Sequence, residues 1–130
     1  MTAADGSDEG RHLPHAAQID AYGNGGFRFA DMSHRGSLLC LPDGVWAWPI
    51  TRADEIDERA LARVFARANE LDTLIVGTGR EIAPFPGELR QALRSVSVVV
   101  DVMQTGAAIR VYNIMIGERR RVAAALIAVP

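Results

Sequence analysis

The sequence contains no lysine and only one cysteine, and its 14 basic residues are all arginine. A Walker-type phosphate loop needs a lysine to reach the phosphates, so the missing lysine excludes that nucleotide-binding motif. A single thiol, Cys40, excludes an internal disulfide. Because no second cysteine stands near a histidine, the sequence also lacks the spacing of a structural zinc site. We therefore expect no metal and no cofactor.

The sequence also lacks long apolar runs and any large excess of charge of one sign. The longest apolar run, residues 122–129, is far shorter than the roughly 20 residues of a membrane-spanning helix, so we expect no transmembrane segment. No basic cluster followed by an apolar stretch opens the chain, so a cytoplasmic location is the default expectation. The net charge is -2, and most arginines are interleaved with acidic residues. This pattern does not indicate nucleic-acid binding.

What is present divides the chain into a short tail and one domain. Residues 1–16 contain Asp5, Asp8 and Glu9 but no aromatic residue, so we expect a disordered acidic tail. The remaining residues, 17–130, have the length of a single domain.

Short apolar stretches separated by turn residues follow the tail and predict β-strands joined by tight turns. Phe27 and Phe29 flank an arginine, and Trp46 and Trp48 flank an alanine, so each aromatic pair lies on one face of a strand. The two pairs predict a small antiparallel β layer.

The period then changes, and the second half predicts alternating helices and strands. Residues 57–70 predict an amphipathic helix with Asp57 as its N-cap. Two continuous apolar runs, 73–77 and 96–102, predict parallel strands covered on both faces, with a helix from near Pro86 between them. A helix over 106–118 that is buried on more than one side and a final strand over 121–129 complete the chain. The expected fold class is therefore α/β.

One strand-to-helix corner is a candidate ligand site. After the run 73–77 come Gly77, Thr78, Gly79 and Arg80, but the third glycine of a dinucleotide fingerprint is replaced by Ile82. A weaker reading survives, in which the free amides and Arg80 hold a small anion.

Asp101 and Thr105 follow the second parallel strand at the same sheet edge and are expected to face the same pocket. Alternatives without a ligand stay open. In these the glycines only turn the chain, Asp101 is a surface carboxylate, and Thr105 caps a helix.

Catalytic patterns are scarce. The three histidines fall in the tail or in a probable loop, which suits preorganised catalysis poorly, and Cys40 sits in an apolar stretch typical of an inert buried thiol. Tyr112 and Asn113 are expected in the core. We assign no catalytic residue. Arg119, Arg120 and Arg121 follow the last helix, either because cations favour a helix C-terminus or as a docking patch for an acidic partner.

An ordered set of motifs from about residue 18 to 130 resembles domain of unknown function 498, the Mth-like family. The set is Gly77-Thr78-Gly79, Met103 to Ala108, Tyr112-Asn113, Glu118 with Arg120, Val122, and Ala124 to Leu126. The resemblance implies a three-layer fold with a central mixed sheet, flanking helices and an extra β layer. This chain departs from the family pattern at Arg119, where relatives usually have glycine, and at Ile109, where they frequently have cysteine.

Relatives in this family include a mitochondrial assembly factor for respiratory complex I and an adipogenesis-associated protein. Together with the missing catalytic set, the resemblance implies a non-enzymatic accessory protein whose expected partner is a subunit of a respiratory or other membrane-associated complex. The alternative from the residues is a small-anion binding domain or enzyme that uses the turn from Gly77 to Arg80.

Overall fold

The computed structural model describes residues 10–130, which form a six-stranded mixed sheet, a separate three-stranded sheet and three α-helices. The strands are β1 Arg11–Leu13, β2 Ala21–Gly23, β3 Gly26–Phe29, β4 Met32–Arg35, β5 Ser37–Leu41, β6 Gly44–Trp48, β7 Thr73–Gly77, β8 Val99–Met103 and β9 Val122–Leu126. The helices are α1 Ala62–Ala66, α2 Gly87–Ser95 and α3 Thr105–Gly117, with 3-10 turns at Ala53–Glu55 and Ala68–Glu70.

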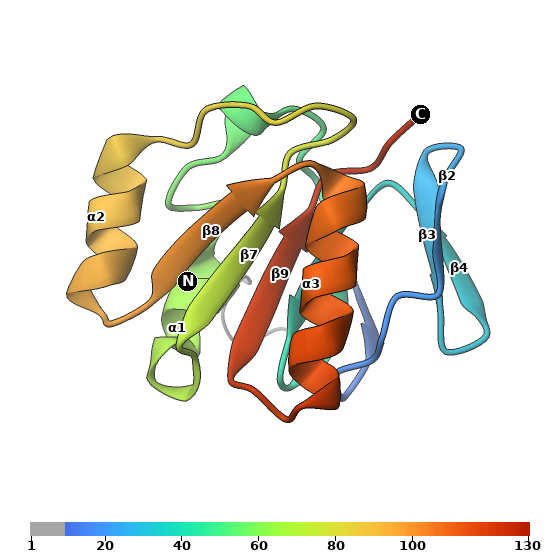
Figure 1. Ribbon diagram of the computed structural model, residues 1–130, viewed down its shortest axis with the longest axis horizontal. Helices are drawn as coiled ribbons and strands as arrows, with labels where there is room; N and C mark the ends of the chain where they lie inside the picture. The colour runs from blue at the N-terminus through green and yellow to red at the C-terminus, as the bar shows by residue number, and fades with distance from the viewer. Residues whose placement is uncertain (1–9) are drawn as a thin grey trace.

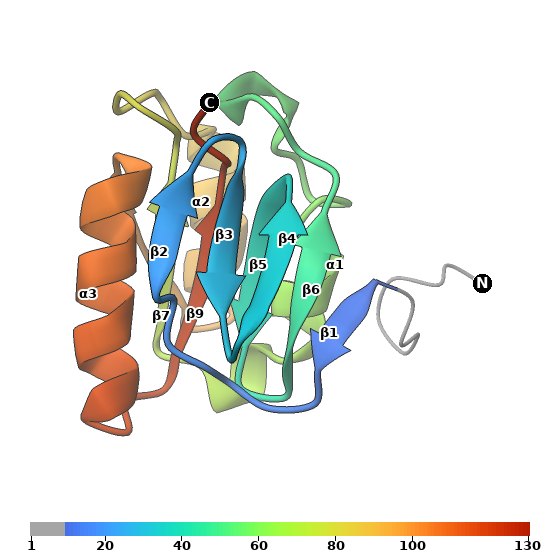
Figure 2. The ribbon, with the colours of Figure 1, turned by 90° about the vertical axis from the view of Figure 1, so that its right-hand side faces the viewer.

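The large sheet has the order β1-β6-β5-β9-β7-β8 and lies between two layers (Figure 1). One face packs against α1 and α2 in a core that includes Trp46, Trp48 and Leu93. The other face packs against α3 and the small sheet β2-β3-β4, which stand side by side in Figure 2. The predicted three-layer α/β fold with a mixed central sheet and a small antiparallel layer is confirmed.

The small sheet is held by the aromatic pair that its sequence pattern predicted. Phe27 and Phe29 are buried in the core beneath α3, whereas Arg28 between them is exposed. An Asn24-Gly25 turn with φ values of 52° and 79° joins β2 to β3, as expected of a two-residue hairpin. The tryptophan pair instead belongs to β6 of the large sheet, so it does not anchor the small layer.

The two apolar runs form parallel neighbours, as predicted, because β7 pairs in parallel with both β8 and β9. The expectation that both runs are covered on two faces is wrong for β8. Val99 is 61% exposed and Asp101 is exposed, because β8 is the edge strand and α3 packs mainly over β7 and β9. The last strand, β9, lies inside the sheet between β5 and β7.

The helix predicted over 57–70 is wrong in its extent. The segment contains turns, the five-residue α1 and a 3-10 turn, linked by hydrogen bonds between residues three apart, such as Leu61 N to Glu58 O. Asp57 accepts a hydrogen bond from the Ala60 amide at 2.8 Å and so closes a turn rather than capping a long helix. The buried Leu61 and Val64 produce the helical period that the sequence shows.

The folded region also begins earlier than predicted. Residues 11–13, which we placed in the acidic tail, form β1 and pair antiparallel with β6. The Arg11 guanidinium lies 5.5 Å from the centre of the Trp46 ring, a cation–π contact that helps to hold this strand. Residues 10 and 14–16 of the predicted tail are described and belong to no helix or strand, and residues 1–9 lie outside the described residues. Within residues 10–130, no helix combines the length and the apolar character needed to cross a membrane.

Candidate functional site

The predicted corner after β7 lies next to the end of β8. Gly77 and Met103 are register partners at the carboxyl ends of the two strands, and the Thr78 amide donates to the Met103 carbonyl at 2.9 Å. The expectation that these two turns share one sheet edge is therefore confirmed. Whether the corner holds a ligand depends on what fills it.

Each glycine of the corner has a structural reason to be glycine. A Cβ on Gly77 would lie 2.9 Å from the Thr105 Cα and 3.1 Å from the Ala108 Cβ, so the glycine lets the start of α3 approach the strand. Gly79 has a φ of +106°, a conformation that side chains strongly disfavour. Helix packing and the turn thus account for both residues without a ligand.

Thr105 ties three segments together. Its hydroxyl donates to the Ile127 carbonyl at 2.7 Å and accepts a hydrogen bond from the Gly79 amide at 2.9 Å, and its side chain is fully buried. The Thr105 amide donates in turn to the Gly79 carbonyl. The interpretation of Thr105 as the helix cap is wrong, because Gln104 occupies the cap position and Thr105 is the first residue of α3.

The other predicted ligand residues are arranged less closely. The Thr78 hydroxyl donates to the Glu81 carbonyl at 2.8 Å and accepts from the Ala83 amide at 3.0 Å, so it closes its own turn. Arg80 is exposed, with a guanidinium nitrogen 3.4 Å from the Pro130 carbonyl. Asp101 points to the α3 side of β8, two residues before the strand end, and is exposed. The amides of Thr78 and Gly79 have internal partners, so an anion at this corner stays a prediction.

Cys40 is the buried thiol that the sequence predicted. Burial raises its pKa to about 12, so the thiolate needed for nucleophilic chemistry is scarce near neutral pH. Its neighbour Tyr112 is fully buried, and burial, followed by the proximity of Cys40, raises the pKa of that phenol as well. Within residues 10–130, the Tyr112 hydroxyl has no hydrogen bond of good geometry.

Asn113 fixes the start of the small sheet to α3. Its side-chain amide accepts a hydrogen bond from the Ile19 amide at 2.9 Å and donates to the Ile19 carbonyl at 2.8 Å. Asn113 was expected in the core, and it is half-buried with both groups of its side-chain amide bonded to backbone.

The predicted docking arginines follow the end of α3. Arg119 has a φ of 59°, and the amides of Arg119 and Arg120 donate to the carbonyls of Ile116 and Met115, which is a Schellman ending. This geometry explains why glycine suits the position that Arg119 occupies. Two of the arginines have nearby acids, since Arg120 lies 3.5 Å from Glu118 and Arg121 lies 3.7 Å from Asp72. All three are exposed, and their docking role stays a prediction.

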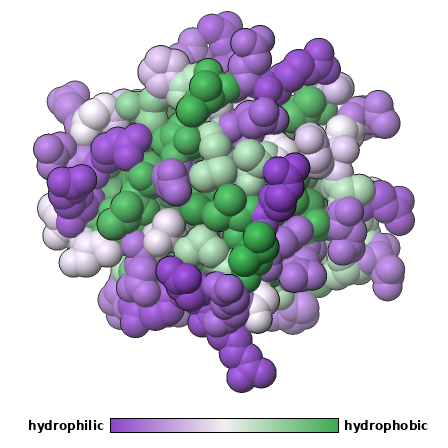
Figure 3. Space-filling view, in the orientation of Figure 1, coloured by the Kyte–Doolittle hydropathy of each residue, from purple (hydrophilic) through white to green (hydrophobic). Residues whose placement is uncertain are grey.

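Two surface features escaped the sequence-based reasoning. The first, which we call the apolar shelf, lies where α3 leaves β8 uncovered, and Figure 3 shows apolar side chains gathered over the middle of this face. Its members are Ala107, Val111 and Ile114 of α3 and Val99 and Met103 of β8. Residues 107, 111 and 114 repeat at the spacing of one helix face, and this repeat was the available signal.

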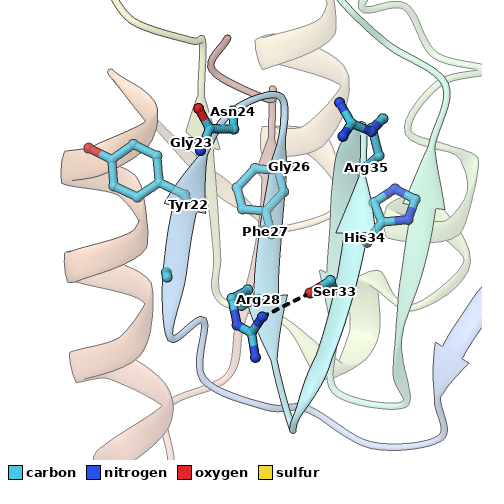
Figure 4. Close-up of a pocket in the computed structure, with 10 residues that line it drawn as sticks. Tyr22, Gly23, Asn24, Gly26, Phe27, Arg28, Ser33, His34 and Arg35 are labelled. Carbon is cyan, nitrogen blue, oxygen red and sulfur yellow. Dashed lines mark hydrogen bonds between the residues drawn. The ribbon is translucent and has the colours of Figure 1, made fainter.

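The second feature is a hollow of about 440 Å³ on the outward side of β2, β3 and β4 (Figure 4). Its side chains come from residues up to 14 positions apart in the sequence, between Ala21 and Arg35. Only strand register brings them together, so no local motif marks the hollow.

Comparison with known proteins identifies the family. The model of a protein family of unknown function (DUF498/DUF598) matches residues 19–127. The chain belongs to this family. The resemblance inferred from the ordered motifs is therefore confirmed, and the match covers all the helices and every strand except β1.

Solved structures show the same fold. The Rpa2829 protein of Rhodopseudomonas palustris is 66% identical, with a TM-score of 0.81 over 92% of this chain and 88% of that one. A protein from Bartonella henselae, described as an outer membrane protein, is 45% identical, with a TM-score of 0.88 over 92% of this chain and 100% of that one. A Bordetella pertussis protein described as a Mth938-like domain is 28% identical, with a TM-score of 0.76 over 85% of each chain.

Among curated proteins, the chain is similar to human NADH dehydrogenase (ubiquinone) 1 alpha subcomplex assembly factor 3. The two are 28% identical over 120 residues, which are 92% of this chain and 65% of the human protein. The chain thus spans slightly less than two thirds of this relative.

Proposed function

We propose that this protein is a non-enzymatic accessory protein that binds a subunit of a respiratory or other membrane-associated complex during its assembly. The similarity to assembly factor 3 supports an assembly role. The observation that carries the proposal is the apolar shelf, because a contiguous patch of exposed apolar side chains is characteristic of protein docking sites.

The shelf arises because α3 packs mainly over β7 and β9 and leaves the edge strand β8 largely uncovered on that side. Val99 is 61% exposed on the edge strand, and Ile114 is 57% exposed on α3. Ile114 belongs to α3, which packs over β7. Val99 lies on the same side of the large sheet, because its register partner in β7 is Thr73. A partner that buries these two side chains would gain roughly 25 cal/mol of binding free energy for each Å² of apolar surface removed from water.

The charges around the shelf favour a partner that presents both apolar and charged side chains. Asp101 projects from β8 between Val99 and Met103, and Arg119 to Arg121 lie at the C-terminal end of α3. The arginines form a charged margin like the rim of a protein interface, whereas Asp101 lies among the apolar members of the shelf. We therefore propose that the partner subunit presents an apolar segment with a basic group opposite Asp101 and acidic groups near the arginines.

A matched set of surface variants tests the proposal. The full-length protein, tagged and expressed in its own cells, is recovered after mild solubilisation, and the co-purifying proteins are identified by mass spectrometry. Val99→Glu with Ile114→Glu is the shelf variant. Ile82→Glu is the control, because Ile82 is also an exposed apolar residue, at 68%, but lies in the loop between β7 and α2.

We expect subunits of a membrane-associated complex with the parent and the Ile82 variant, and at least a tenfold lower recovery with the shelf variant. Substituting Arg119, Arg120 and Arg121 together by serine should lower recovery less, because rim charges mainly affect association rates. Recovery of the protein alone would refute the assembly role. Equal recovery with the shelf variant would refute the docking site.

The anion-binding alternative at the turn from Gly77 to Arg80 gains no support from the geometry, because the amides of Thr78 and Gly79 already have internal partners. A thermal-shift screen of the parent and Arg80→Ala with nucleotides, coenzyme A compounds and sugar phosphates tests it directly. A ligand at 100 times its dissociation constant should stabilise the parent by about 2.7 kcal/mol.

A further inference from the structure

The outward side of the small sheet is a hollow with a floor almost free of side chains. Ala21 pairs with Arg28 and Gly23 pairs with Gly26, so small residues occupy the middle of the exposed face. Gly26 has no alternative, because a Cβ there would collide with the His34 carbonyl of the neighbouring strand. At about 440 Å³ the hollow has the size of a small-molecule site, for which roughly 300–1,000 Å³ is usual.

The polar groups at the hollow are cationic or neutral. Arg28 and Arg35 belong to the outward rows of β3 and β4, and both are exposed. The Arg28 guanidinium donates to the Ser33 hydroxyl at 3.3 Å, which is drawn as the dashed line in Figure 4. The lining includes no aspartate or glutamate. In the described part of the chain, neither arginine has a carboxylate within ion-pair distance.

His34 also borders the hollow, but its ring nitrogens are engaged elsewhere. Nε2 lies 3.1 Å from the Ser37 carbonyl, to which it donates, and Nδ1 lies 3.0 Å from Nε2 of His12. Because burial and the nearby His12 lower the pKa of His34, the positive charge at neutral pH comes from the two arginines. The Arg28 guanidinium lies beside the Ser33 hydroxyl, and the Arg35 guanidinium lies at the other end of the hollow (Figure 4). Most of their hydrogens have no acceptor among the described residues.

We propose that this hollow binds a small molecule through phosphate or carboxylate groups, held by Arg28 with Ser33 at one end and by Arg35 at the other. A guanidinium presents its N–H groups as a fork that matches both anions, so the two arginines can each donate a pair of hydrogen bonds. The Ser33 hydroxyl supplies a further donor. The bare floor lets the body of the ligand lie against the backbone of β2 and β3.

NMR titration of the full chain tests the proposal with two simple probes. Inorganic phosphate and citrate are added separately at constant ionic strength while the backbone amide signals are recorded. The variants are Arg28→Gln, Arg35→Gln and the pair together. Arg94→Gln on α2 is the control, because Arg94 is also exposed but lies on the opposite side of the large sheet.

We expect saturable shifts of the amides of Gly23, Gly26 and Ser33 with at least one probe. The double variant should weaken binding at least tenfold, and the control should bind as the parent does. Saturation with phosphate alone identifies a phosphate ligand, and saturation with citrate alone identifies a carboxylate ligand. Because all the substituted arginines are exposed, unchanged dispersion of the remaining signals will show that each variant is folded.

Three results would overturn the proposal. The shifts could be linear and spread over the surface, or they could be the same in the double variant as in the parent. An acidic peptide could also shift these amides when neither small probe does, which would assign the hollow to protein recognition. None of these results bears on the apolar shelf, so the two proposals fail independently.

Discussion

Replacing Thr105 with valine isolates what its hydroxyl contributes to the corner between β7 and α3. Valine has nearly the same shape as threonine, but it can neither donate to the Ile127 carbonyl nor accept from the Gly79 amide. Gly79 and Ile127 are both buried, so water cannot replace the lost partner.

The magnitude follows from those two orphaned groups. A buried backbone donor or acceptor left without a partner costs about 1–3 kcal/mol, and a carbonyl with a second lone pair falls at the lower end. We therefore expect Thr105→Val to lower the free energy of unfolding by about 2–4 kcal/mol. For a domain of this length, that loss corresponds to a Tm decrease of roughly 6–20 °C.

Urea denaturation followed by circular dichroism measures the change, with Thr105→Ser as the matched control. Serine keeps the hydroxyl and loses one methyl group, so it should cost only about 1 kcal/mol. The m-value should be the same for all three proteins, because the folded core is unchanged. If valine were no worse than serine, the hydroxyl would not hold the corner together and our account of Thr105 would be refuted.

Two further predictions concern the end of α3 and the histidine pair. Arg119→Gly should raise the free energy of unfolding by about 0.5–1 kcal/mol, because Arg119 has a left-handed φ of 59°. Arg120→Gly is the control and should not stabilise the protein, because Arg120 does not have a positive φ. Equal urea midpoints for Arg119→Gly and the parent would contradict the reasoning. Burial, followed by the nearby charge of His12, lowers the pKa of His34, so the unfolded chain binds the proton more readily and stability should fall as the pH drops from about 6.5 towards the lower folded pKa. Thermal unfolding between pH 7.5 and pH 5 checks this, since His34→Gln should flatten the pH dependence relative to the parent and His15→Gln should not.

The strands were predictable because local signals and tertiary structure agree there. The run from Thr73 to Gly77 is continuous and apolar, and it is buried almost throughout. The short β1 was not predictable, because Arg11-His12-Leu13 carries a single apolar residue and its strand conformation depends on pairing with β6. The same limit explains residues 57–70, where tight turns between residues three apart bury the same side chains that a continuous helix would bury.

The corner after β7 shows why the candidate site was harder to predict than the fold. The sequence does not distinguish a glycine needed for close packing from a glycine needed for ligand binding. Only the position of α3 reveals that a side chain at Gly77 would meet Thr105 and Ala108. Thr105 was likewise interpreted as a cap because it precedes a helix, whereas its hydroxyl bonds to residues 26 positions before it and 22 positions after it.

The filled corner changes where function should be sought in this fold. Open α/β sheets usually bind ligands in the crevice at the carboxyl ends of their parallel strands. Here Thr78 and Thr105 bond to backbone groups at that edge, and an anion site there stays a prediction. Two exposed surfaces lie elsewhere in the described part of the chain. Val99 and Ile114 leave apolar surface beside α3, and Arg28 and Arg35 leave positive charge on the small sheet. Apolar surface favours a protein partner, and guanidinium groups without a carboxylate partner among residues 10–130 favour an anion. The two surfaces are therefore suited to different ligands and can be separated by mutation.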